Sequence, residues 1–137
     1  MRNRWVDQTK YYDPEDPNKG NCAEASCAAL FNIPLEDVGV FYDPNGLPTP
    51  SYRYWRNFEN FCWSRGFWVK RHDGDYQPEA IYLASGPSAR GCSHMVVMKD
   101  GSLLHDPHFS RDGLLKVEHV WLLIPRDPAE LTWNPQS

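Results

Sequence analysis

The sequence predicts a single α+β domain, in which helices come first along the chain and an antiparallel sheet follows. Helix-forming residues and helical spacing dominate the part before Gly66, whereas short runs of β-branched and aromatic residues follow it. That order is typical of α+β domains. With 137 residues, the range 1–137 has the length expected of one domain with a sizeable core.

The first helix is expected from about Cys22 to Asn32, because alanines are good helix formers and Pro34 cannot continue the hydrogen-bond ladder. A loop then leads to a second helix over residues 51–66, in which apolar residues recur at helical spacing. The strands are expected at 67–71, 80–86, 93–107 (a hairpin) and 117–125.

Charge and hydropathy argue against two classes of partner. The formal net charge is −4 and no cluster of basic residues with interleaved aromatics occurs, so nucleic acid is not expected as a ligand. The start, "MRNRWVDQTK", lacks the apolar stretch of a signal peptide or membrane anchor, and no long apolar run follows. We therefore expect a cytoplasmic protein without a membrane partner, whose four cysteines are free thiols.

One cysteine has an unusual position. In "GNCAEASCAAL", residues 20–30, Cys22 precedes the apolar run and falls in the first turn of the expected helix, whereas Cys27 falls among alanines, as a core residue would. A helix N-terminus stabilises a thiolate and so lowers the pKa of a cysteine. Cys22 is therefore a candidate nucleophile, although an unreactive thiol at a helix start would fit this segment equally well.

A histidine base and an orienting carboxylate can be found in the expected hairpin "CSHMVVMKDGSLLHDPH". A three-residue loop at 99–101 would pair His94 with Asp106 across two strands. A two-residue turn would instead pair His94 with Pro107 and direct Asp106 to the opposite face. A working site requires the first arrangement, so we expect the three-residue loop.

Two segments, "GNCAEASCAALFNIPLEDV" and "SHMVVMKDGSLLHDPH", resemble the papain-like cysteine peptidase superfamily, in particular its small bacterial and bacteriophage-encoded members. The resemblance implies a papain-like fold with a Cys-bearing helix packed on the sheet. It also implies Cys22 as nucleophile, His94 as base and Asp106 as the orienting group. An upstream glutamine, Gln8, would complete the oxyanion hole, with Asn21 as the alternative donor.

The expected activity is hydrolysis of an amide or peptide bond through an acyl-enzyme, without a cofactor, on a peptide, protein or small amide. Acyl transfer to an amine would use the same residues. If the chain is phage-encoded, it would act in the host cytoplasm. Two other functions are open: an idle papain-like domain that binds a peptide or host protein, and a metal-binding domain. The metal ligands would come from one hairpin: Cys92, His94, His105 and His108.

Overall fold

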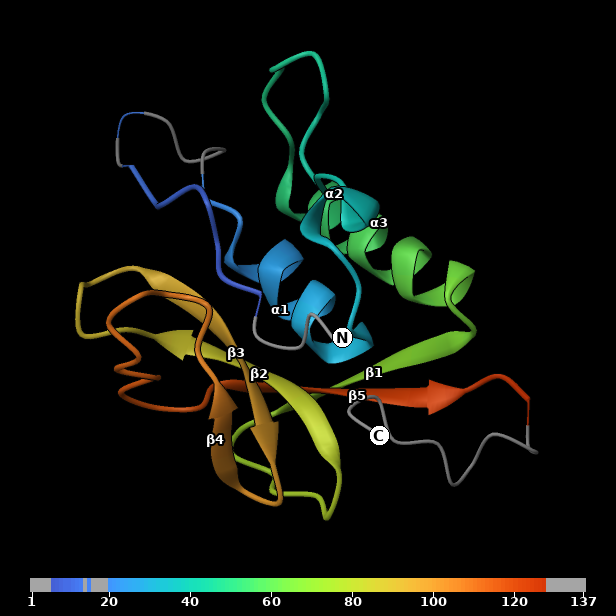
Figure 1. Ribbon diagram of the computed structural model, residues 1–137, viewed down its shortest axis with the longest axis vertical. Helices are drawn as coiled ribbons and strands as arrows, with labels where there is room; N and C mark the ends of the chain where they lie inside the picture. The colour runs from blue at the N-terminus through green and yellow to red at the C-terminus, as the bar shows by residue number, and fades with distance from the viewer. Residues whose placement is uncertain (1–5, 14, 16–19, 128–137) are drawn as a thin grey trace.

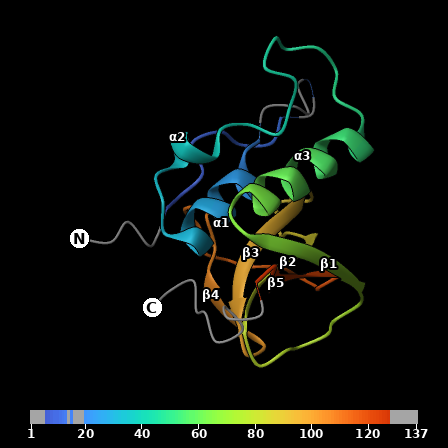
Figure 2. The same ribbon diagram turned by 90° about the vertical axis from the view of Figure 1, so that its right-hand side faces the viewer.

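The computed structural model describes residues 6–13, 15 and 20–127, and these form an α+β fold, as expected. In this part of the chain three helices precede five strands: α1 (Cys22–Phe31), α2 (Leu35–Val38), α3 (Ser51–Ser64), β1 (Phe67–Asp73), β2 (Ile81–Pro87), β3 (Ser93–Lys99), β4 (Ser102–His105) and β5 (His119–Pro125). The strands form one antiparallel sheet in the order β1-β5-β2-β3-β4. The helices lie together over one face of that sheet (Figures 1 and 2).

Helix α1 is the central helix of the fold. Its residues from 23 to 30 are all buried, because the small alanine side chains allow the helix to pack closely on β3 and β2. The helix ends at Phe31, one residue earlier than expected. Asn32 adopts the left-handed conformation with φ of 58°, and its N–H donates to the carbonyls of Ala28 and Ala29.

Apolar side chains cover both faces of the sheet. The main core lies between the helices and the sheet, where Trp55 of α3 stacks on Trp121 of β5 with ring centroids 4.7 Å apart. A smaller cluster on the other face joins Tyr82 and Val96 to the loop that precedes β5. The central strand β2 is accordingly buried on both faces from residue 82 to residue 86.

The turn between β3 and β4 differs from the expected one. Lys99 pairs directly with Ser102, so the turn contains only Asp100 and Gly101, and the predicted three-residue loop is wrong. Both turn residues have positive φ, 52° and 85°, as a two-residue hairpin turn with the twist of the strands requires.

A β-bulge then changes the register within the same hairpin. Met98 pairs with Leu103 but Val97 pairs with His105, which leaves Leu104 as an extra residue on β4. One inserted residue reverses the alternation of side chains from that point onward. The bulge thereby offsets the effect of the short turn and returns Asp106 to the side of the sheet that carries His94.

No helix in the described ranges is both long enough and apolar enough to span a membrane.

Candidate active site

Helix α1 places the candidate nucleophile against the histidine strand. Cys22 and Ser26 are four residues apart and therefore share one face of the helix. The Ser26 hydroxyl donates to the Met95 carbonyl of β3 at 3.1 Å, and the Met95 backbone N–H forms a hydrogen bond with the Cys22 sulfur. The thiol thus lies against the residue that follows His94 in the chain.

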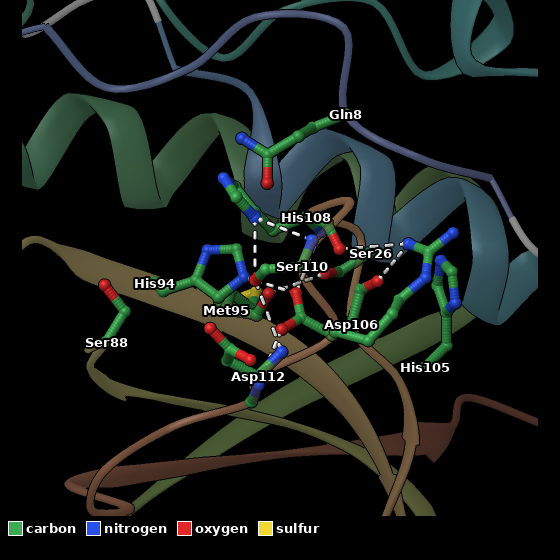
Figure 3. Close-up of polar contacts among 12 residues, drawn as sticks. Gln8, Ser26, Ser88, His94, Met95, His105, Asp106, His108, Ser110 and Asp112 are labelled. Atoms are coloured by element: carbon green, nitrogen blue, oxygen red, sulfur yellow. Dashed lines mark hydrogen bonds and ion pairs between the residues drawn. The ribbon is translucent and has the colours of Figure 1, made fainter. Parts of the chain in front are cut away.

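His94 and Asp106 form a buried pair. Nε2 of His94 lies 2.6 Å from Oδ1 of Asp106, and the exposed fractions of the two side chains are 2% and 0%. Asp106 also accepts backbone N–H groups from His108, at 2.8 Å, and from Gly113, at 2.7 Å. Figure 3 shows the His94 ring directed at this carboxylate.

These contacts fix the charge of Asp106 and the tautomer of His94. Burial alone would raise the pKa of Asp106, but the hydrogen bonds from His94, His108 and Gly113 outweigh it and lower the pKa to about 2. An ionised carboxylate can only accept, so His94 carries its proton on Nε2. In the neutral form of the ring, Nδ1 is then the nitrogen that can accept a proton, as a general base must.

The Cys22 thiol is held neutral, contrary to the lowered pKa expected at a helix start. Desolvation by the surrounding protein is the largest influence, and together with the charge of Glu24 it raises the pKa of Cys22 to about 12 despite the hydrogen bond from Met95. A helix dipole contributes only about 0.3–1 kcal/mol and cannot offset burial of this extent. The Cys22 thiol is therefore protonated at rest.

Gln8 is buried at the same site. Its backbone N–H donates to the Pro107 carbonyl at 3.0 Å, and its side-chain Nε2 donates to the Lys10 carbonyl at 2.9 Å. The carboxamide has a second N–H, which can donate to an oxyanion. Its oxygen is buried and has no hydrogen-bond partner among the residues that the structure describes.

The side chain of Asn21, the alternative oxyanion donor, is hydrogen-bonded to the segment before the helix. Its side-chain oxygen accepts the backbone N–H groups of Thr9 and Lys10 at 3.1 and 3.0 Å, and its amide nitrogen donates to the Thr9 hydroxyl at 3.0 Å. Both ends of the amide are therefore engaged in holding the segment that carries Gln8. The contacts favour Gln8 as the oxyanion donor.

Arg111 connects this segment to the loop after β4. Its guanidinium forms two 2.7 Å bonds with the Asp7 carboxylate and also donates to the carbonyls of Asp106 and His108 at 2.6 and 3.1 Å. The positions of Gln8 and of the Asp106 carboxylate are thus linked through one side chain.

The candidate nucleophile, base and oxyanion donor share one cavity of about 980 Å³. Its lining includes Gln8, Cys22, His94 and His108. The sequence left His108 as one of five histidines that could serve as base and as a candidate metal ligand, without placing it beside His94. In the structure its ring stands edge-on to that of His94, with centroids 6.2 Å apart. An Asp-x-His segment in which the aspartate accepts the N–H two residues later is an Asx-turn, and that local signal could have placed His108 beside Asp106.

The histidines do not form the metal site that the sequence left open. Nε2 of His105 donates to the Val6 carbonyl at 2.8 Å, whereas His94 is bonded to Asp106. Within residues 6–13, 15 and 20–127, no group of three or more metal-binding side chains is found. The four cysteines are free thiols, of which Cys27 and Cys62 are buried.

Comparison of the chain with protein-family models, with curated proteins and with solved structures finds no match. The papain-like resemblance therefore stays a hypothesis that rests on this chain's own residues.

Proposed function

We propose that the protein is a cysteine-dependent hydrolase of amide or peptide bonds with a papain-like site. The observation that carries the proposal is the buried His94–Asp106 pair, 2.6 Å apart, whose histidine lines the same cavity as Cys22. A buried carboxylate that orients a histidine next to a thiol is the arrangement that nucleophilic catalysis needs.

In this proposal the Cys22 proton moves to Nδ1 of His94 as the sulfur attacks the substrate carbonyl, because the resting thiol is neutral. Asp106 stabilises the imidazolium that forms. The Cys22 backbone N–H and the Gln8 carboxamide hold the oxyanion. The protonated histidine then gives its proton to the leaving amine, and water hydrolyses the thioester to release the acid.

The test uses a biotinylated peptidyl vinyl sulfone, which a catalytic histidine activates by protonating the carbon next to the sulfone. We expect labelling at Cys22, located by peptide mass spectrometry. Replacement His94→Ala should slow it on the order of a hundredfold, the usual contribution of a general acid–base. His72→Ala is the matched control, because His72 lies on β1 and its ring packs at a tilt against Tyr76, outside the cavity lining. Equal labelling of wild type and His94→Ala would contradict the proposal.

Hydrolysis itself is tested with a mixture of proteome-derived peptides, in which mass spectrometry detects new termini. Cleavage by the wild type and its absence with Cys22→Ala would support the enzyme.

The second candidate, a binding domain that uses the same cavity, is favoured by one observation, the raised pKa of Cys22. If the protein bound peptides but neither cleaved them nor became labelled by the vinyl sulfone, the binding domain would be the better candidate.

A further inference from the structure

The turn from Ser88 to Cys92 holds an arginine beside the cavity. The backbone N–H and the hydroxyl of Ser88 both donate to the Cys92 carbonyl at 2.9 Å, and Gly91 N–H donates back to the Ser88 carbonyl at 3.0 Å. Arg90 lies within this closed turn, and it lines the cavity together with Cys22. Three hydrogen bonds within five residues limit the motion of the backbone that presents the guanidinium.

Arg90 is also connected to His108. Its Nη1 donates to the Ser110 hydroxyl oxygen at 3.2 Å, and Oγ and the backbone N of Ser110 lie 2.9 and 3.1 Å from Nδ1 of His108. Because a backbone N–H can only donate, Nδ1 is the acceptor and the neutral ring carries its proton on Nε2. In the described part of the chain nothing accepts this Nε2–H.

The charged side chains that line the cavity in the described part of the chain are the cations Arg71 and Arg90, while Asp106 and Asp112 act on His108 from outside the lining. Arg111 and Arg71 each have a carboxylate partner, Asp7 at 2.7 Å and Asp73 at 3.3 Å. Arg90 has no carboxylate within 4.0 Å among the residues that the structure describes. No aspartate or glutamate of the described ranges lines the cavity, although the whole chain has a net charge of −4.

We propose that Arg90 and His108 form an anion subsite that binds a carboxylate of a peptide-like substrate close to the bond attacked by Cys22. A guanidinium presents paired N–H groups that match a carboxylate, and the free Nε2–H of His108 adds a third donor. The carboxylate could come from the C-terminus of a peptide or from an acidic side chain. This inference rests on the proposed function, because it takes Cys22 as the reacting group.

The first test compares the alkylation rates of Cys22 with iodoacetate, an anion, and with iodoacetamide, its neutral analogue. Both reagents consume the same thiolate, so the ratio of the two rates does not depend on the pKa of the thiol. Arg90→Gln should lower the iodoacetate-to-iodoacetamide ratio about threefold, because it removes one positive charge from a partly solvated cavity. Peptide mass spectrometry separates Cys22 from Cys92, which also lines the cavity.

Two variants serve as controls. Arg90→Lys keeps the charge and should retain most of the ratio, whereas Arg56→Gln removes an exposed charge of α3 that does not line the cavity and should leave the ratio unchanged. An unchanged ratio in Arg90→Gln, or an equal fall in Arg56→Gln, would overturn the anion subsite.

A second test identifies the source of the carboxylate and does not depend on thiol reactivity. Three tripeptides are titrated into Cys22→Ala, and nuclear magnetic resonance follows their binding. One carries a glutamate side chain between blocked ends, one has a free C-terminus and no charged side chain, and one is blocked at both ends and has no charge. We expect one charged peptide to bind at least threefold more tightly than the neutral one, and Arg90→Gln to abolish the difference. Equal affinities in Cys22→Ala would overturn the subsite. Failure of both alkylating reagents to label Cys22 would count against the proposed function alone.

Discussion

The replacement Asp106→Asn tests how the carboxylate under His94 contributes to the fold. A carboxyl whose pKa falls from 3.8 to about 2 on folding stabilises the native state by about 2 kcal/mol at neutral pH. In the wild type, the Asp106 carboxylate accepts the Gly113 N–H at 2.7 Å. In the variant, the amide nitrogen of the new asparagine would face one of the N–H groups that the carboxylate accepts, so that two donors would face each other. The unpaired donors add to the loss. We expect a total of about 2–4 kcal/mol at pH 7.

The pH dependence separates the charge from other effects of the replacement. Because the folded-state pKa is depressed, the stabilisation is complete above the unfolded-state pKa of 3.8 and is lost as the pH falls toward 2. Roughly half of it should be gone at pH 3. Urea denaturation followed by tryptophan fluorescence gives the free energy of unfolding of both proteins at pH 7 and pH 3. The gap between wild type and Asp106→Asn should narrow at the lower pH.

Asp112→Asn is the matched control, because Asp112 belongs to the same loop and its side chain is exposed. It should change the free energy of unfolding by less than about 0.5 kcal/mol. If Asp106→Asn were as stable as the wild type at pH 7, or if its deficit were the same at both pH values, the ionised, hydrogen-bonded carboxylate would not stabilise the fold as argued.

Two further predictions concern the thiol and the segment that carries Gln8. With a pKa of about 12, Cys22 should be alkylated by iodoacetamide at a rate that still rises at pH 10, and a plateau below pH 7 would instead indicate a preformed thiolate–imidazolium pair. Asn21→Ala should destabilise the fold by about 1–3 kcal/mol and speed amide exchange at Thr9, since three hydrogen bonds are lost. Asn45→Ala, at an exposed site, controls for the substitution, and unchanged exchange at Thr9 would refute the role given to Asn21.

The helices and strands could be predicted because their signals are local. The alanines after Cys22 favour a helix and Pro34 ends it, whatever the rest of the chain does. The pKa of Cys22 could not be predicted in the same way. The helix position is visible in the sequence, but the desolvation that dominates the pKa arises only when β3 packs on the helix.

The hairpin shows a different limit. The pair Asp100-Gly101 is by itself a strong signal for a two-residue turn, but in a regular ladder such a turn separates His94 from Asp106, and the predicted loop was therefore longer. A second irregularity, the bulge at Leu104, makes the two-residue turn compatible with the contact between His94 and Asp106. A leucine within a strand has no local feature that marks a bulge. Its position depends on the contacts of the whole hairpin, above all on the donors that gather around the Asp106 carboxylate.

The two candidate functions make different demands on that carboxylate. An idle binding domain needs a filled core beneath the cavity, and a buried ionised group is a costly way to fill it. A hydrolase with a neutral resting thiol has to stabilise a proton on His94 only while the sulfur attacks, and a carboxylate 2.6 Å from Nε2 acts at that moment. The raised pKa of Cys22 and the lowered pKa of Asp106 are therefore compatible within one mechanism, in which proton transfer accompanies attack. The binding-domain hypothesis accounts for the neutral thiol and leaves the buried carboxylate only its role in stabilising the fold. In the hydrolase the same carboxylate also stabilises the imidazolium that forms during attack, and for this reason we favour the enzyme.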